Sequence, residues 1–505
     1  MAILRYTASA DTTITDALKF DMSTKATGSN MGSADSLQIF SIYGQASGSS
    51  GMGTTVEKSR TLVNFSSSVA QIMTDRAAST IPASGSVSFY LRMFNARTPF
   101  TLPDKFTLVA HPISRSWDEG YGLDMDTYID SGYANWIAAS SASSGITDWT
   151  TQGGDYHTGS YVAGSTLPFY SQYFKEGTED LEIDITSLVE EWVASNGSDA
   201  RANYGVGVFL TSSQEDGSEK RSYYIKKFYA RGTEYYFKRP LVEARWDDSK
   251  KDDRGDFYLS SSLAPAADNL NKLYLYNYVK GQLKNIPALG AGTIFVSIYS
   301  GTTAPTSEKL QLPAGGGVVS AADLNITASF VSTGIYSASF ATTSSVSSTE
   351  YLFDVWHRGG TEYFTGSAIS PKSLAQHNNN VTNDWVTTIT NLKTSYSTTE
   401  TARFRVFTRT QNWSPTIYSK ATTAIKPVIL RDAYYRIYRV SDNLEAIGYG
   451  SGSVKHTQLS YDASGSYFDL KMDLFEPGYA YGIKILSNDN GATVEHPETF
   501  KFRVE

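Results

Sequence analysis

The alternation of apolar and polar positions predicts β-strands along most of the chain. A clear case is the stretch 181–185, where Leu181, Ile183 and Ile185 alternate with Glu182 and Asp184. A period of two residues is typical of a strand with one buried face. Strands of this kind, separated by turns rich in Gly, Ser and Asn, indicate β-sandwiches.

The period changes directly after this strand. Ser187 and Glu190 have the spacing of a helix capping box, which predicts a short helix. Its apolar face would hold Leu188, Val189, Trp192 and Val193. Since the run 204–210 is apolar again, we expect the helix to lie between two strands and to plug the open end of a sandwich. Trp192 would be its structural anchor, with no role in chemistry.

The same pattern gives an N-terminal domain over residues 1–246. Its further strands are expected at 3–14, 61–65, 87–94 and 106–113, and as two strands around Arg231-Gly232 within 223–246. Between Ser114 and Phe169 lies a long excursion that contains Trp117, Trp136 and Trp149. Long loops inside compact domains are usually functional, so this one is expected to bind a ligand or to form an interface.

Two further domains follow. A charged and then Ser/Ala/Pro-rich stretch, 247–266, reads as a linker, and 371–380 reads as a second one. The pattern from Thr333 to Phe340 and the aromatic strand that ends at Trp356 indicate an immunoglobulin-like sandwich over 267–370. Residues 381–505 are expected to form a third β-sandwich. The predicted fold is all-β and multidomain: an N-terminal jelly-roll-like β-sandwich with a short plug helix, followed by two immunoglobulin-like β-sandwiches.

Composition narrows the function classes. The 505-residue chain has no cysteine, which excludes disulfides, thiolate zinc sites and cysteine nucleophiles. Its net charge of −8 argues against a global electrostatic grip on nucleic acid. There are 34 tyrosines, more than Phe and Trp together, and we expect them on half-exposed sheet faces that meet other proteins. No signal peptide or transmembrane stretch is recognisable, so we expect a chain made in the cytosol without export and without a membrane partner.

No motif for catalysis or for cofactor binding stands out. The six histidines lack metal-ligand spacing, and no P-loop, dinucleotide fingerprint or nucleophile elbow is present. We therefore expect a protein that is not an enzyme, with no catalytic, cofactor-binding or metal residues.

Acidic groups leave calcium open as an alternative, because oxygen-rich loops suit this ion. They are Asp118-Glu119, Asp124 with Asp126 and Asp130, and Asp252 with Asp253 and Asp256. None matches an EF-hand loop, and solvated acidic loops are the commoner case.

The tryptophans of the excursion are the candidate glycan contacts. Trp117 adjoins Asp118 and Glu119, which places an indole that could stack on a sugar beside two carboxylates. The alternative for Trp117, Trp136 and Trp149 is that they pin the loop to the sandwich. A lower-ranked alternative makes Asp118 and Glu119 the acid pair of a polysaccharide-degrading enzyme.

Basic residues and aromatic residues interleave over 220–239, as in proteins that bind single-stranded nucleic acid. Because the segment reads as strands with an aromatic face and a lysine face, we favour a solvated or subunit-facing strand and expect no nucleic acid. Arg254-Gly255-Asp256 spells an adhesion tripeptide, which we attribute to chance.

The order of eight segments carries a resemblance. They are RTLVNF (60–65), SVSFYLRMF, SRSWDEG (114–120), WTTQGGD (149–155), IDITSLVEEW, NYGVGVFL, KKFYAR and RPLVEARW. In this order the N-terminal half resembles the DNRLRE-type domain, which implies a jelly roll like that of carbohydrate-binding modules. The literal string that names the family is absent. The C-terminal half, with YFDLKMDLFEPGYAYGIKI and FKFRVE, is similar to structural proteins of tailed bacteriophages.

Together these features favour a non-enzymatic virion structural protein of a bacteriophage, such as a capsid decoration, neck, tail or fibre component. It would be assembled into the virion in the host cytoplasm and would dock to other virion proteins through Tyr-rich sheet faces and edge strands. A homo-oligomer is expected. The alternative is a carbohydrate-binding adhesion protein that recognises a host-surface glycan.

Overall fold

The computed structural model describes residues 2–48, 51–98, 102–127, 132–142, 145–157, 170–195, 202–216, 218–219, 221, 223–310, 325–342, 351–372, 385–411, 413, 427–489 and 491–505. These residues divide into two compact units, Ala2–Asp247 and Asp248–Glu505. The regular secondary structure of both is mostly β-strand, which confirms the prediction of an all-β, multidomain chain.

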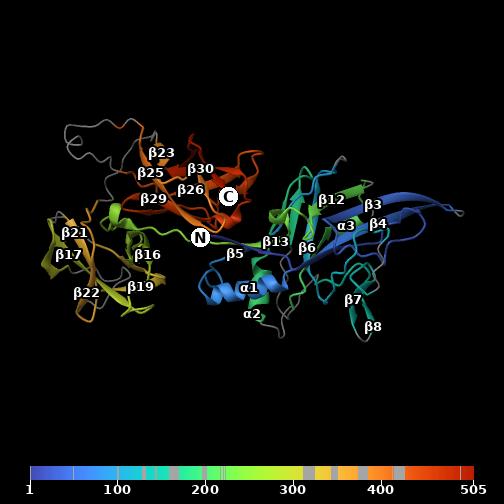
Figure 1. The fold of residues 1–505 in the computed structure, drawn as a ribbon, viewed down its shortest axis with the longest axis horizontal. Helices are drawn as coiled ribbons and strands as arrows, with labels where there is room; N and C mark the ends of the chain where they lie inside the picture. Colours follow the sequence, from blue (N-terminus) through green and yellow to red (C-terminus); the bar gives the residue numbers. More distant parts are fainter. Residues whose placement is uncertain are drawn as a thin grey trace. The chain divides into compact units, whose positions relative to one another are not determined.

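Two antiparallel sheets make the body of the first unit (Figure 1). The smaller sheet has the order β1 (Ile3–Thr7), β13 (Leu241–Arg245), β5 (Ser88–Met93), β10 (Leu181–Asp184). The larger has the order β12 (Tyr223–Tyr229), β3 (Ser36–Gly48), β4 (Gly51–Asn64), β11 (Val206–Leu210), β6 (Phe106–Pro112), β9 (Tyr170–Phe174), with β2 (Ala10–Thr15) paired to β4. One apolar core joins the inner faces of the two sheets, so this unit is a β-sandwich.

Two helices close one end of the sandwich, where one was predicted. They are α1 (Ser66–Ala77) and α2 (Thr186–Ser195), which pack side by side in Figure 1. Arg76 of α1 forms a bidentate ion pair with Glu190 of α2 at 2.6 and 2.8 Å. Trp192 of α2 is buried in the core of the sandwich.

The predicted capping box is wrong. The Ser187 hydroxyl hydrogen-bonds to the Tyr170 hydroxyl, and Glu190 is committed to Arg76. The helix instead begins at Thr186, two residues before the start that a cap at Ser187 implies. The Asp184 carboxylate accepts the N–H of Thr186 and so satisfies one of the first free donors of the helix.

A second core covers the outer face of the larger sheet. Ile14 of β2 and Leu62 of β4 point into it and meet the excursion, which carries the hairpin β7 (Ala138–Ala142) and β8 (Gly145–Asp148). Where the excursion covers it, the larger sheet is therefore buried on both faces. This explains why all five residues of β11 are buried and apolar or glycine.

The second unit contains a seven-stranded sheet, which we call the middle sheet. Its order is β14 (Asn271–Tyr276), β20 (Ile335–Phe340), β19 (Ile326–Ser332), β17 (Ile294–Gly301), β21 (Tyr351–Arg358), β22 (Thr361–Thr365), with β18 (Pro305–Lys309) paired to β17. The sheet surrounds an apolar core centred on Trp356 and Tyr336. A short hairpin of β15 (Tyr278–Val279) and β16 (Gln282–Leu283) follows β14 along the chain.

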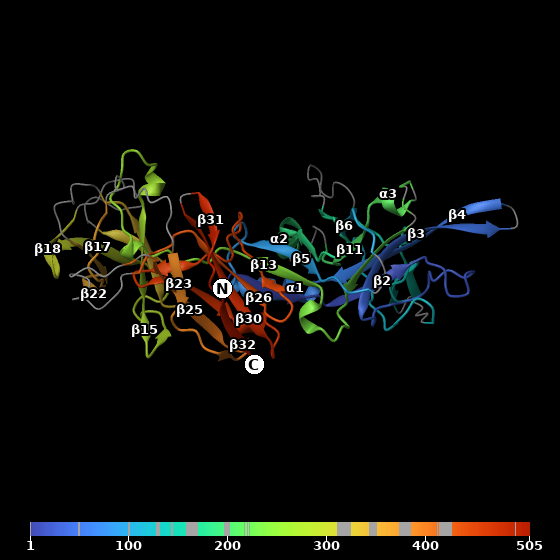
Figure 2. The same ribbon diagram turned by 90° about the horizontal axis from the view of Figure 1, so that it is seen from above.

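The C-terminal part has two sheets (Figure 2). Their orders are β23 (Trp385–Ile389), β25 (Thr401–Thr410), β29 (Gly465–Lys471), β28 (Ser460–Asp462), and β24 (Ser395–Tyr396), β32 (Phe500–Val504), β30 (Ala480–Asp489), β26 (Ala433–Arg439), β27 (Glu445–Ile447), with β31 (Ala492–Glu495) on β30. Aromatic rings fill its core. Phe468 stacks on Phe404 and on Tyr435 with centroid distances of 5.0 and 4.2 Å.

The predicted linker 247–266 is instead a packed segment of the second unit from Asp248 onward. Phe257 is fully buried in the core of the middle sheet. Lys251 forms a bridge with Tyr461, and Tyr258 forms one with Lys372. Charged residues made this stretch look like a linker, but four of them, all between positions 252 and 256, form internal ion pairs. Of the second predicted linker, only residues 371 and 372 lie in the described part of the chain.

Candidate functional site

The three tryptophans expected to contact glycan lie together, but in the second core. Trp117, Trp136 and Trp149 are each buried. The indole N–H of Trp117 donates to the Tyr204 carbonyl and that of Trp149 to the Asn135 carbonyl, both at 2.9 Å. A sugar needs an exposed indole face on which to stack, so their placement contradicts the glycan-contact hypothesis. They pin the excursion to the sheet, which was the alternative.

A partly buried arginine holds the same region together. The Arg60 guanidinium pairs with Glu215 at 2.5 and 2.9 Å and donates to the Gly153 carbonyl at 3.0 Å. It also lies 4.6 Å from the centroid of the Phe209 ring and 5.6 Å from that of Trp136. The face of the sheet that the excursion covers is thus closed by packing and by charge.

The carboxylates Asp118 and Glu119 point to different partners. Asp118 accepts the N–H of Ser141, whereas Glu119 pairs with Arg231 at 2.6 Å and accepts the N–H of Asp11 at 2.8 Å. Burial raises the pKa of the neighbouring Asp11 to about 7. The hydrogen bond from the Arg231 N–H lowers this pKa, whereas the nearby Glu119 charge raises it further. The arrangement ties three segments of the sandwich together and does not form a paired acid and base.

The predicted calcium groups are also engaged within the protein. The Asp124 carboxylate accepts the N–H groups of Asp126 and Thr127, and Asp126 accepts the N–H of Phe20. Asp130 lies outside the described residues. Among the residues that are described, no group of three or more acidic or histidine side chains could hold a metal ion.

In the second unit the acidic triplet and the Arg-Gly-Asp tripeptide form one internal network. Arg254 pairs with Asp354 at 2.5 Å and with Asp252 at 3.3 Å. Asp256 pairs with Lys372 at 2.7 Å and Arg431 at 2.6 Å. Both charged ends of the tripeptide are therefore committed to neighbours, which agrees with a chance occurrence.

Beside this network lies a cavity of about 280 Å³. Its polar wall is held by internal bonds: the Asn271 amide donates to and accepts from the backbone of Tyr258, and Asp253 accepts from the Tyr461 hydroxyl. A ligand site would need polar groups that converge on the space, whereas these groups point into the surrounding protein.

The basic segment 220–239 is only partly on the surface. β12 ends at Tyr229, and the second strand begins at Leu241, after a short 3₁₀ turn, rather than directly after Gly232. Lys226 is buried, and its ammonium donates to Asn95, Gly177 and Glu179 at 2.7–2.8 Å. Burial lowers the pKa of Lys226 to about 8.

A feature that the sequence interpretation missed projects from the first unit. The β3–β4 hairpin runs on beyond the sheet as a two-stranded ribbon, with register pairs from Tyr43–Val56 to Gly48–Gly51 (Figure 1). On one side β12 pairs with β3 only as far as Ile42, and on the other β2 pairs with β4 only from Ser59 onward. We call residues 43–48 and 51–56 the arm. Between Tyr43 and Val56 the sequence has no charged residue and no proline.

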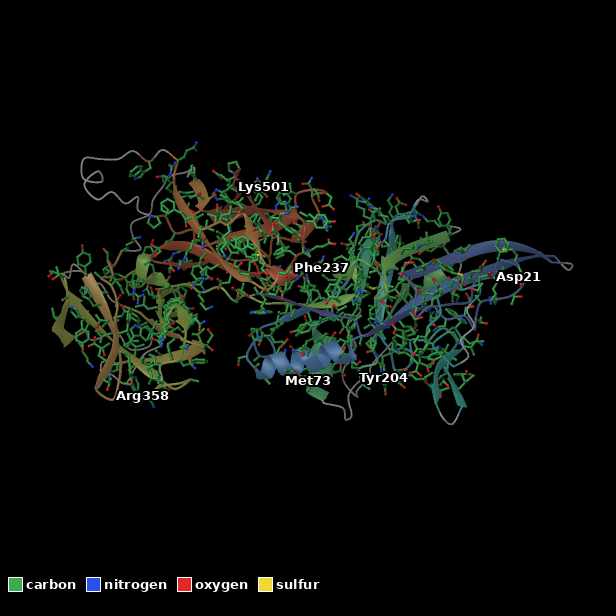
Figure 3. All side chains as sticks on the ribbon, viewed as in Figure 1. Asp21, Met73, Tyr204, Phe237, Arg358 and Lys501 are labelled. Atoms are coloured by element: carbon green, nitrogen blue, oxygen red, sulfur yellow. The ribbon has the colours of Figure 1, made fainter. Side chains whose placement is uncertain are left out.

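Large apolar side chains are exposed near the base of the arm. Phe20 is 92% exposed and Met22 73%, and both lie in the turn 19–24. The Leu18 N–H donates to the Glu57 carboxylate at 2.8 Å, which ties this turn to β4. Asp21, labelled in Figure 3, accepts the N–H groups of Ser23 and Thr24, so the turn is held in one conformation.

The neighbouring loop adds Tyr121 and Leu123, which are 74% and 52% exposed. Two hydrogen bonds join the loop to the turn. The Asp126 carboxylate accepts the N–H of Phe20, and the backbone carbonyl of Asp126 accepts a hydrogen bond from Lys19 Nζ. We call Phe20, Met22, Tyr121 and Leu123 the apolar patch.

The fully buried Asn30 side chain connects the loop that carries Tyr121 and Leu123 to its own segment of the chain. Its amide nitrogen donates to the carbonyls of Glu119 and Ala134 at 2.8 and 2.9 Å. Its amide oxygen accepts the N–H groups of Gly32 and Gly122 at 3.0 and 2.9 Å. A Cβ at Gly122 would lie 1.8 Å from the Asn30 carbonyl oxygen, so only glycine allows the two segments to approach this closely.

Comparisons with known proteins leave the family open. No protein family and no curated protein matches the chain. Among solved structures, the titin fragment A168–A169 is similar at 10% identity, over 47% of this chain and 92% of that chain, with a TM-score of 0.15. The Ig1–2 module of the Drosophila receptor tyrosine phosphatase DLAR matches at 8% identity, over 47% and 91%, with a TM-score of 0.14. Native E. coli alpha-2-macroglobulin matches at 7% identity, over 94% and 26%, with a TM-score of 0.16. At these TM-scores the likenesses carry no conclusion about this chain.

In the part of the chain that the structure describes, none of the helices has the length and apolar character needed to cross a membrane.

Proposed function

We propose that this chain is a non-enzymatic structural protein of a bacteriophage virion, a decoration, neck, tail or fibre component, that acts by docking to other virion proteins. The observation that carries the proposal is the arm together with the apolar patch near its base. The phage context comes from the resemblance of the C-terminal half.

Four large apolar side chains are exposed on two segments that hydrogen bonds join to each other, and such exposure is unfavourable in water. Clustered exposed apolar side chains usually mark an interaction site. The turn 19–24 and the Asn30 support hold these side chains in place before a partner arrives, which lowers the entropy lost on binding. Docking is therefore assigned to this surface.

This assignment revises the expected mechanism. Docking was predicted through Tyr-rich sheet faces and edge strands, yet many tyrosines are buried in the cores, among them Tyr224, Tyr336, Tyr435 and Tyr467. Their rings supply apolar volume, and several hydroxyls bond internally, as Tyr467 does with Tyr276.

The alternative, glycan adhesion, has less support because the three candidate indoles are covered. A glycan array with the full chain tests it. Binding to a defined glycan that persists in Trp117→Phe would place a sugar site elsewhere and would favour the alternative.

The proposal is tested by mass spectrometry of purified particles from a phage that encodes the chain. We expect the wild-type protein in the particles and a marked loss of incorporation for the double variant Phe20→Ser/Met22→Ser. The matched control is Tyr173→Ser, which also removes an exposed large side chain from this unit, at 57% exposure. Absence of the wild-type protein from particles would refute the proposal, and equal loss in the control would refute the assignment to the patch.

A further inference from the structure

We infer that the arm binds a second copy of this chain by antiparallel pairing of β3 with β3 of the partner. The inference rests on the proposed function, since it names the first partner of the docking surface. Its basis is the arm's open strand edge, its composition and the exposed residues where β12 stops.

The direction of the backbone groups identifies the open edge. In an antiparallel ladder the N–H and C=O groups of alternate residues point to opposite sides. The N–H of Phe40 points toward β4, because it donates to Ser59 Oγ at 2.9 Å. By alternation, Tyr43, Gln45 and Ser47 point their N–H and C=O groups away from β4, toward the side where β12 has ended.

That side would accept one more strand. Among the described residues, the strand paired to β3 on this side is β12, and its last register pair is Tyr223–Ile42. An incoming strand along residues 43–48 would continue the line of β12 and extend the larger sheet. Ile42 and Tyr223 are 38% and 42% exposed, and they lie where the end of that strand would cover them.

The composition of the arm indicates that a partner is needed. Free edges are usually protected by lysine, proline or a bulge, and from Tyr43 to Val56 the arm has no charged residue and no proline. A two-stranded ribbon on its own is only marginally stable in water, whereas three or more strands are favoured.

A second copy is the partner that fits this edge. Pairing of β3 with the same strand of another copy is isologous, so each edge supplies the same row of donors and acceptors that the other needs. The chain carries a net charge of −8, so two copies repel each other on average. Since the arm is uncharged, contact through it brings no like charges together at the interface.

Sedimentation velocity of the full chain over a concentration series tests the inference. We expect reversible dimers or larger assemblies for the wild type. Gln45→Pro removes an outward N–H while leaving the β3–β4 ladder intact, since proline is tolerated at strand edges, and it should weaken association at least about tenfold. The matched control is Thr54→Pro, because Thr54 is paired with Gln45 and points to the opposite edge.

The outcomes separate cleanly. A wild-type chain that stays monomeric, or prolines that weaken association equally at both edges, would overturn the inference. The proposed function is tested by a separate measurement, the presence of the protein in purified particles. A chain that is incorporated but associates equally well with Gln45→Pro would therefore disprove the β3 pairing alone.

Discussion

Replacing Asn30 by alanine should detach the loop that carries part of the apolar patch. The side chain makes four hydrogen bonds of 2.8–3.0 Å in a fully buried position. Asn30→Ala leaves two carbonyls and two N–H groups without these partners. Each unsatisfied buried group costs about 1–3 kcal/mol, and because water will reach some of them we expect a total of about 4 kcal/mol.

Hydrogen–deuterium exchange of the full chain measures this change. If loop opening governs exchange, about 4 kcal/mol corresponds to a loss of protection of roughly a thousandfold at residues 30–32 and 119–122.

The matched control is Asn135→Ala. Asn135 is also buried, but its side chain bonds only within its own turn, to Tyr133, Ile137 and Ala138. Its loss should raise exchange near 133–138 and leave residues 30–32 protected. Protection at residues 30–32 within about tenfold of the wild type in Asn30→Ala would refute the reasoning, because it would mean that packing alone holds the two segments.

Three further predictions concern stability. Trp192→Ala removes a buried anchor of the first unit and should cost about 3–5 kcal/mol, seen as a lower melting temperature; an unchanged melting temperature would contradict the role of anchor. Burial raises the pKa of Asp11 to about 7 from an unfolded value near 3.9. The stability that this group contributes is therefore fully present below about pH 4, falls as the pH rises, and is lost once the pH has passed through 7. Asp11→Asn should therefore gain melting temperature relative to the wild type at pH 8 but not at pH 4, and a gain equal at both would disprove it. Lys226→Met leaves three oxygen acceptors without their ammonium and should cost about 2–4 kcal/mol in denaturant unfolding, whereas a neutral result would show that the three bonds add nothing net.

Strand patterns predicted the framework because a sheet with one buried face shows period two locally. The segment around Ile183 is an example: its alternation gives β10 correctly. The helix α2 was found from its apolar face, although its cap was assigned to the wrong residues. Charged stretches misled more: the residues of 248–256 read as solvated, yet Arg254 and Asp256 form ion pairs with partners far along the chain.

The candidate site was largely beyond prediction from local patterns. The arm is built from Gly, Ser and Thr, which signal turns rather than strands, so only its register with β4 reveals it. The burial of Trp117 depends on a second core that residues from β2 and β4 complete. The importance of Asn30 follows from four bonds to segments up to 104 residues away. A clue was present in the unusual turn 19–24, where Phe20 and Met22 stand among polar residues.

The pairing of β1 with β13 has a consequence for synthesis. Ile3 pairs with Arg245, so the first strand of the chain cannot reach its place until about the last strand of its unit has left the ribosome. At about 5–20 residues per second, the nascent chain waits roughly 12 to 50 s with this sheet incomplete. The β3–β4 hairpin joins neighbouring segments and forms early by comparison. During translation its uncharged edge is therefore available before the body that carries it is complete, and nascent chains on neighbouring ribosomes have the opportunity to pair through it.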